Sequence, residues 1–164
     1  MAIAEIESEV LRRAHGIWLR KRGTRRFPPR GDISARDLAS FLRNVTLYRI
    51  FGGGKNFEYR IMGDAAVVAW GRSFHGMGRS ELNDLQPGMG DVIARVCRWV
   101  ARERDPLVMR GVLRKEFSDT RRQESIFLPL GEDDDTVDHI LCVGIYVPVS
   151  IDELALSDDE TDRK

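Results

Sequence analysis

The amino-acid sequence predicts an α+β domain, in which five strands form one antiparallel sheet, central helices cover one face and a further helix flanks the N-terminal side. Three observations predict this class. Apolar residues recur at helical spacing near the start of the chain and again over 88–104, two strand-like stretches lie between 44 and 62, and three more follow residue 106. Two strands, a helical block and three further strands favour a single antiparallel sheet.

Length and composition are typical of one globular domain. The chain has 164 residues, 42% of them apolar, and a formal net charge of zero. It contains no apolar run of the roughly 18 to 20 residues that a membrane-spanning helix needs. Its first residues lack the basic and apolar regions of a signal peptide. We therefore expect a cytoplasmic protein without a membrane span.

The first predicted element is a helix over residues 3–21. Its apolar side chains repeat at intervals of three and four, which places six of them on one stripe: Ile3, Ile6, Val10, Ala14, Ile17 and Trp18. Pro28 and Pro29 then interrupt the helical pattern. A second, short helix is predicted over 35–42, with Ser34 as its N-cap.

A hairpin is predicted next. Residues 44–51 and 55–62 are rich in β-branched and aromatic side chains, and the consecutive glycines Gly52–Gly54 separate them. Glycines before a lysine also occur in phosphate-binding loops, but such loops lead into a helix, and a strand is predicted here. The hairpin is therefore favoured.

The middle of the chain is predicted to be helical. A short helix covers 64–70, and a loop with at most one further helical turn covers 71–85. A longer helix follows over 88–104. Its valines stand four positions apart and so share one row, which we expect to pack on the sheet: Val92, Val96 and Val100.

The last third predicts three strands, over 107–114, 125–130 and 137–149. The third of them is apolar on both faces, so we expect it to be a central strand. Residues 42–150 would then form the main domain, and residues 1–41 an N-terminal helical extension. Residues 151–164 are acidic and lack aromatic side chains, so we expect a flexible tail that is dispensable for folding.

Several short stretches together resemble the PAS domain family, in particular the short single-domain PAS proteins of alphaproteobacteria. The resemblance covers residues 15–148 and rests on Trp18 with residues 21–23, and on the stretches 28–33, 42–45, 57–63 and 70–76. It implies a sensory or protein-interaction module in bacterial signalling rather than a defined ligand. The sequence departs from the usual sensor layout, because no kinase, cyclase or DNA-binding domain follows the last predicted strand.

The PAS topology implies a pocket between the sheet and the central helices. The candidate ligand-binding residues lie on the apolar faces that would line it: Tyr59, Ile61, Trp70, Phe74, Val96, Met109, Phe127 and Val143. The alternative is that these side chains form ordinary core. No cofactor can be named. The flavin-binding Asn-Cys-Arg-Phe-Leu motif is missing, and the histidines do not occupy the mid-domain helix used by haem-binding relatives.

Residues with catalytic or metal-binding chemistry are scattered. His15, His75 and His139 are far apart and form no zinc-binding pattern. Cys97 and Cys142 lie in apolar stretches, which favours burial over reactivity. No serine is part of a nucleophile motif. We therefore expect no enzyme activity and no metal site.

Charge is distributed unevenly. Residues 11–30 carry eight basic and no acidic side chains, whereas residues 131–162 carry eleven acidic and no basic ones. A basic arm can bind nucleic acid, but this one overlaps the predicted amphipathic helix, so nucleic-acid binding is disfavoured. The alternative is that the two segments screen each other, within one chain or across a dimer.

The favoured function is a non-catalytic module that relays its state by contact with an unidentified signalling protein. The alternative is a sensor that binds a small molecule in the pocket. The six-residue apolar stripe near the N-terminus extends beyond the expected core, and it must be buried on the sheet or against another chain. We expect it to form a homodimer interface, as flanking helices often do in PAS relatives.

Overall fold

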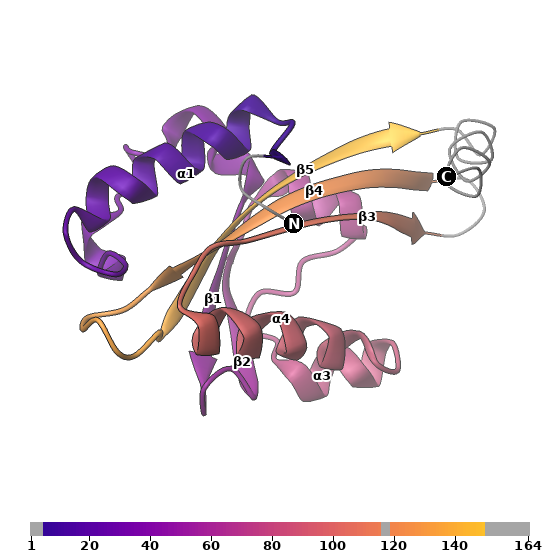
Figure 1. Cartoon of the computed structure of the whole chain (residues 1–164). Coiled ribbons are helices and arrows are strands. Elements are labelled where there is room, and N and C mark those ends of the chain that lie inside the picture. Colours follow the sequence, from indigo (N-terminus) through magenta and orange to yellow (C-terminus); the bar gives the residue numbers. More distant parts are fainter. Residues whose placement is uncertain (1–4, 116–118, 150–164) are drawn as a thin grey trace, which may run out of the picture.

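A five-stranded antiparallel sheet forms the centre of the molecule (Figure 1). The computed structural model describes residues 5–115 and 119–149. Its strands are β1 (Val45–Phe51), β2 (Asn56–Met62), β3 (Leu107–Lys115), β4 (Asp119–Leu130) and β5 (His139–Val149). The order across the sheet is β2-β1-β5-β4-β3. The apolar strand β5 is therefore central, and the hairpin β1–β2 is present, as the sequence predicts.

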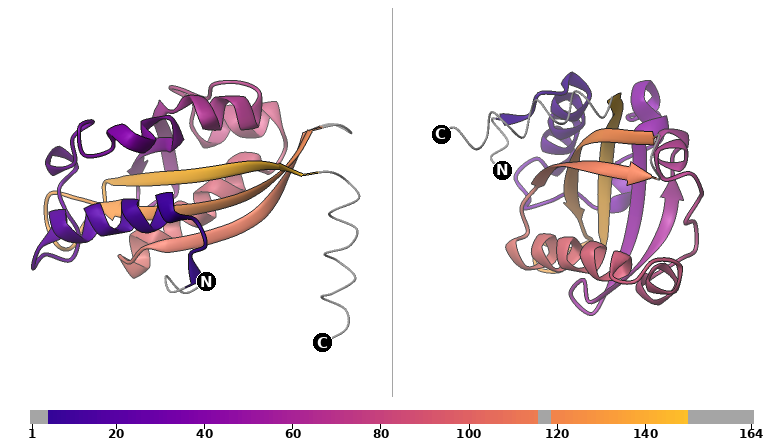
Figure 2. Two further views of the ribbon diagram at one scale, coloured as in Figure 1. Left: turned by 90° about the horizontal axis from the view of Figure 1, so that it is seen from above. Right: turned by 90° about the vertical axis from the view of Figure 1, so that its right-hand side faces the viewer.

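The sheet has two covered faces (Figure 2). Side chains alternate along a strand, so Tyr48 and its neighbour Leu47 point to opposite faces. We call the side of Tyr48 the helix face, because α2 (Asp64–Trp70), α3 (Arg79–Leu85) and α4 (Met89–Glu103) lie there. We call the side of Leu47 the outer face, and α1 (Glu9–Arg22) lies across it.

Helix α4 packs on the helix face, but not through the whole predicted row. Val96 and Val100 are buried, together with Cys97 on the adjacent row. Val92 is 44% exposed. The prediction for Val92 is wrong because this first turn of α4 packs against α3 through the small residue Gly90, and not against a strand. A Cβ at Gly90 would lie 2.1 Å from the Arg79 carbonyl oxygen.

The segment 71–85 contains the complete helix α3, where a single helical turn was expected. The Glu81 carboxylate accepts a hydrogen bond from the Gly78 amide at 3.1 Å and fixes its start. The Asn83 side-chain oxygen accepts from the Gly90 and Asp91 amides at 2.8 and 3.3 Å. Only Leu82 of α3 is buried, so the sequence offers no apolar stripe that would reveal the helix.

Helix α1 begins at Glu9, six residues later than predicted. The Ser8 hydroxyl accepts a hydrogen bond from the Leu11 amide at 3.5 Å and serves as the N-cap. The Trp18 indole N–H donates to the Pro129 carbonyl oxygen at 2.8 Å and ties the helix to β4. Because this helix covers the sheet of its own chain, it is packed as part of the same core.

The segment between α1 and β1 forms turns and 3-10 helix instead of the α-helix predicted over 35–42. The two short elements are η2 (Arg30–Asp32) and η3 (Ala39–Asn44). Ser34 does make a local cap, since the Asp37 amide donates to its hydroxyl at 3.3 Å and that hydroxyl donates to the Asp37 carboxylate at 2.7 Å. Phe41 breaks the helix with φ −141° and ψ 23°, which allows its side chain to be buried.

Strands β3, β4 and β5 extend beyond the rest of the sheet (Figure 1). Pairing between β1 and β5 stops at Val45 and Val143, whereas β4 remains paired with β5 as far as Val149. The edge of β5 that faces β1 is therefore open after Val143. Residues 150–164, which include the predicted tail, lie outside the described residues. Within the described part, no helix has the length and apolar character needed to cross a membrane.

Candidate functional site

A cluster of aromatic rings fills the centre of the helix face. Tyr48 contacts Tyr59 with ring centroids 4.7 Å apart, and Tyr59 contacts Phe74 at 5.6 Å. Phe57 and Phe127 pack against Tyr48 at 6.0 and 6.5 Å. All five residues are at most 5% exposed. We call them the aromatic cluster. Rings at these spacings are in van der Waals contact, so they occupy the space that a ligand would need.

The two phenols in this cluster satisfy each other. The hydroxyl oxygens of Tyr48 and Tyr59 are 3.4 Å apart and share a hydrogen bond. Burial raises the pKa of both hydroxyls. Tyr59 raises the pKa of Tyr48 further, whereas the hydrogen bond from Tyr48 opposes the rise at Tyr59 without cancelling it. Both therefore stay neutral over the whole physiological range, and neither can act as a base.

A hollow of about 230 Å³ opens beside the aromatic cluster. Its apolar wall comes from α2, the loop after α2, α3, α4 and β3, in the residues Ala69, Trp70, Phe74, Leu85, Met89 and Leu113. Two polar side chains, Arg72 and Gln86, also line it. We call it the Trp70 hollow. Apolar walls with a few polar groups suit a small ligand, although typical ligand pockets measure roughly 300 Å³ or more.

Most of the predicted pocket residues lie on the helix face. Tyr59, Phe74, Val96 and Phe127 are buried there, while Trp70 and Met109 are half-buried. Only Trp70 and Phe74 line the Trp70 hollow. The other members of the aromatic cluster, Tyr48 and Phe57, were missed. Their alternation with Arg49 and Glu58 was the signal that could have found them.

Two predicted pocket residues lie on the other face, so their assignment is corrected. Val143 pairs with Val45 and Ile126 and is buried on the outer face, opposite its neighbour Cys142. Ile61 pairs with Leu47 and is 42% exposed. A bulge shifts the register at this point, so that Tyr59 and Ile61 do not share a face despite their spacing of two.

Ile61 instead lines an apolar hollow of about 150 Å³ on the outer face. Its walls come from the segment before β1 and from four strands: Arg30, Ile33, Ala35, Leu38, Leu42, Val45, Leu47, Ile61, Leu130 and Leu141. This hollow lies on the opposite side of the sheet from the aromatic cluster. The sequence pattern did not indicate it, because its residues come from segments far apart in the chain.

The predicted interface stripe is largely buried by the chain's own sheet. Ile6, Ala14, Ile17 and Trp18 are at most 5% exposed within one chain. Val10 is half-buried, and Ile3 lies outside the described residues. The four buried side chains of the stripe are therefore not available to a second chain. The expectation is corrected for a physical reason: the outer face offered an apolar surface within the same chain.

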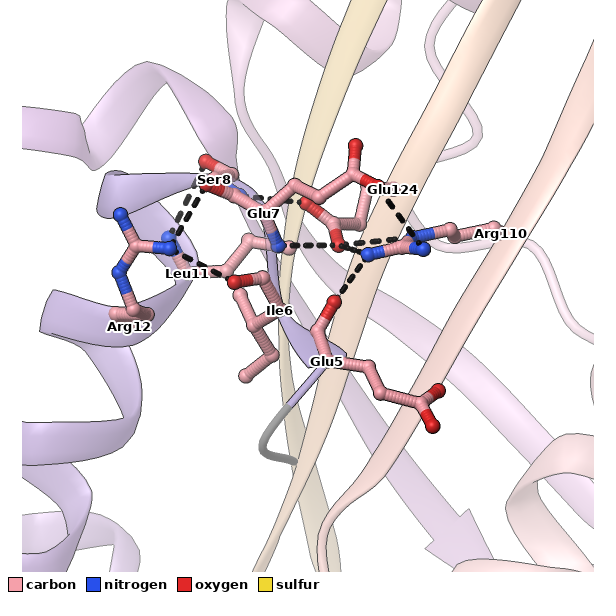
Figure 3. Close-up of polar contacts among 8 residues, drawn as sticks. All are labelled: Glu5, Ile6, Glu7, Ser8, Leu11, Arg12, Arg110 and Glu124. Atoms are coloured by element: carbon pink, nitrogen blue, oxygen red, sulfur yellow. Dashed lines mark hydrogen bonds and ion pairs between the residues drawn. The ribbon is translucent and has the colours of Figure 1, made fainter. Parts of the chain in front are cut away.

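A polar clamp holds the start of α1 on the sheet (Figure 3). The Glu124 carboxylate accepts hydrogen bonds from the amides of Glu7 and Ser8 at 3.0 and 2.9 Å. Arg110 donates to Glu124 at 3.0 Å and to the Glu5 carbonyl oxygen. Burial alone would raise the pKa of Glu124, but these amides and Arg110 outweigh it and hold the pKa below its usual 4.5.

The basic and acidic segments meet within one chain. Arg25 lies 3.6 Å from the Asp134 carboxylate and donates to the Glu132 carbonyl oxygen at 2.6 Å. Arg104, which lies outside the basic segment, is 3.6 Å from Asp135. Part of the acidic loop is therefore screened by arginines of the same chain.

The cysteines are core residues. Cys97 and Cys142 are free thiols that are at most 4% exposed. Burial raises the pKa of Cys97 to about 12 and that of Cys142 further. Across residues 5–115 and 119–149, no three side chains among His, Cys, Asp and Glu gather where they could hold a metal ion.

Comparisons with known proteins agree on the fold. The model of the family described as PAS domain matches residues 6–146. The PAS domain of BvgS from Bordetella pertussis is 18% identical, with a TM-score of 0.50, and the match covers 77% of this chain and 97% of that one. A light-oxygen-voltage domain solved with a flavin analogue is 14% identical, with a TM-score of 0.50, and the match covers 79% and 94%. Comparison with curated protein sequences gives no match.

Proposed function

The chain belongs to the PAS domain family, and on that premise we propose that it is a non-catalytic module that relays its state by contact with a signalling protein in a bacterial cell. The aromatic cluster is the observation that carries this proposal. Tyr59 and Phe127 both pack against Tyr48, in the space where a ligand would otherwise lie. Because the aromatic rings fill the centre of the domain, no space remains there for a ligand. Recognition of a partner would then take place at the surface of the domain. We also propose that the chain is one of the short single-domain PAS proteins of alphaproteobacteria.

A second candidate function is favoured by the Trp70 hollow. Trp70 and Phe74 present aromatic surface there, and Arg72 and Gln86 offer hydrogen-bond donors at the rim. A small apolar molecule with one acidic or carbonyl group would match these walls. The chain would then be a sensor whose ligand lies at the edge of the aromatic cluster and not inside it.

Native mass spectrometry of freshly purified full-length protein separates the two functions. If the chain relays its state by contact, the spectrum should show only the mass of the 18.7 kDa polypeptide, without a bound molecule. A co-purifying molecule that is lost in Leu113→Arg, which fills the Trp70 hollow, and kept in Val112→Arg would support the sensor. Val112 is the matched control because it is 44% exposed and pairs with β4 beside Leu113 without lining the hollow.

A further inference from the structure

The hollow that Ile61 lines on the outer face, which we call the outer hollow, combines a buried apolar floor with exposed apolar side chains. Leu42 and Ile61 belong to its lining and are 44% and 42% exposed. Five further lining residues come from β1, β4, β5 and the segment before β1, and each is at most 6% exposed: Leu38, Val45, Leu47, Leu130 and Leu141. An occupant of the outer hollow would therefore remove apolar surface from water, which favours binding.

Arg30 is the one ionisable side chain among the described residues that line the outer hollow. It is exposed, and its guanidinium forms no hydrogen bond or ion pair with residues 5–115 and 119–149. Two carboxylates lie close in the sequence but do not neutralise it. Asp32 is not part of the lining, and Asp37 lies 3.0 Å from the Lys21 ammonium. A guanidinium without a partner beside an apolar hollow favours an anionic group at that place.

Charge and size together define the class of occupant. A single arginine balances the one charge of a carboxylate, whose planar shape matches the guanidinium, better than the roughly two charges of a phosphate monoester. The outer hollow measures about 150 Å³. An apolar cavity of this size holds a ring of about six carbons. The apolar part of the occupant is therefore small.

We infer that the outer hollow binds a small monocarboxylic acid whose apolar tail has about five or six carbons. The carboxylate pairs with Arg30, and the tail lies on the buried floor and covers Leu42 and Ile61. This site is on the opposite face of the sheet from the aromatic cluster and the Trp70 hollow. The inference does not rest on the proposed function, so either of the two can fail without the other.

NMR titration of the isotope-labelled full chain with sodium hexanoate tests the site at about pH 7, where a carboxylic acid is ionised. The ionic strength is held constant with sodium chloride. The amide resonances of Val45, Leu47 and Ile61 should shift along one saturation curve, whereas those of Trp70 and Phe74 should not move. Butanoate should bind roughly ten times more weakly than hexanoate, because it buries two methylene groups fewer.

The role of the charge is tested at Arg30. Arg30→Gln should raise the dissociation constant for hexanoate roughly two- to fivefold, as expected for the loss of one exposed ion pair. It should leave the constant for hexanol unchanged, because the alcohol carries no charge. Arg36→Gln is the matched control. Arg36 is exposed in the same segment, does not line the outer hollow, and its side chain forms no hydrogen bond or ion pair with the described residues. Both constants should keep their wild-type values in this variant.

The location of the tail is tested by a larger side chain at Ile61. Ile61→Trp should weaken the binding of both hexanoate and hexanol by more than about tenfold, because the indole occupies the space of the tail. Val112→Trp is the control, since Val112 is a 44% exposed residue of the other edge strand and lies outside the outer hollow. Circular dichroism checks the fold of each variant, and Leu42→Trp replaces Ile61→Trp if the latter does not fold.

Four results would overturn the inference. The first is the absence of saturable shifts with hexanoate, and the second is shifts confined to residues of the Trp70 hollow. The third is equal affinity for hexanoate in wild type and Arg30→Gln. The fourth is binding that weakens as the protein concentration rises, because a second copy of the chain would then cover the outer hollow.

Discussion

Burial determines the chemistry of the two thiols. Cys97 and Cys142 face the core, and the pKa of Cys97 is raised to about 12 because the thiolate would be desolvated. We expect neither thiol to react with a disulfide reagent in the folded protein at about pH 8, whereas free cysteine titrates near 8.5. Both should react after unfolding in guanidinium chloride. Rapid modification of one thiol in the folded protein would show that its side chain is accessible.

Glu124 makes the attachment of α1 sensitive to pH. Its pKa is held below 4.5, so the carboxylate stabilises the folded state above that value, and the contribution is lost as the pH falls through the lower folded pKa. Glu124→Gln should therefore lower the free energy of unfolding by about 1–2 kcal/mol at neutral pH. Denaturant unfolding at a series of pH values measures both proteins.

The difference between wild type and Glu124→Gln should shrink as the pH falls below about 4.5, because the Glu124 carboxylate of the wild type is then protonated and is as neutral as the amide of the variant. A difference that is constant down to pH 3 would mean that charge plays no part in the clamp. Glu132→Gln is the matched control, since Glu132 is exposed and its carboxylate forms no hydrogen bond or ion pair with the described residues. Its effect should stay within about 0.5 kcal/mol.

Sequence patterns identified some site residues and misplaced others for local reasons. Tyr59 and Phe74 were found because each stands in an apolar, aromatic stretch. Ile61 was misplaced by the bulge in β2, and no spacing rule reveals a bulge. Val143 was misplaced because β5 is apolar on both faces, so alternation alone does not say which face a residue joins.

At the scale of elements, the orientation of α4 on the sheet can be tested with two valines that were predicted to share one row. Val96 is 7% exposed and Val92 44% exposed. Val96→Asp would bury an unpaired carboxylate and should lower the free energy of unfolding by about 3 kcal/mol or more. Val92→Asp should change it by less than about 0.5 kcal/mol. Equal losses in the two variants, measured by denaturant unfolding, would contradict the orientation of α4.

The docking of α1 is tested at Trp18, whose indole N–H donates to Pro129. Trp18→Phe leaves that carbonyl oxygen unpaired in the core and should cost about 1–3 kcal/mol of unfolding free energy. Trp99→Phe is the control, because Trp99 is half-buried and forms no hydrogen bond within the described residues. The melting temperature should not depend on protein concentration. A concentration-dependent melting temperature would mean that α1 is stabilised by a second chain.

The sequence predicts helices and strands correctly wherever the periodic apolar pattern extends over many residues. The hairpin, α4 and the central position of β5 follow from such patterns. Helix α3 and the 3-10 turns of η3 did not, because each of them buries a single side chain, Leu82 and Phe41 respectively, and so shows no apolar stripe. The start of α1 was placed too early because Ile6 fits the helical stripe, yet it is buried in the extended lead-in before the Ser8 cap.

At the scale of the whole molecule, both faces of the sheet are covered by elements of the same chain. The central helices and the aromatic cluster cover one, and α1 with the segment before β1 covers the other. The basic segment 11–30 meets the acidic loop 132–135 at Arg25 and Asp134, which local periodicity does not predict. Three-dimensional packing therefore assigned the stripe near the N-terminus to the core.

The central claim is that the rings of the chain itself fill the space between the sheet and the central helices. Crystallography under xenon pressure tests it most directly, because xenon enters apolar cavities that are large enough for it. The account predicts xenon in the Trp70 hollow or in the outer hollow beside Leu42, and none among Tyr48, Tyr59 and Phe127. Xenon bound among those three rings, or electron density for a retained small molecule there, would contradict it.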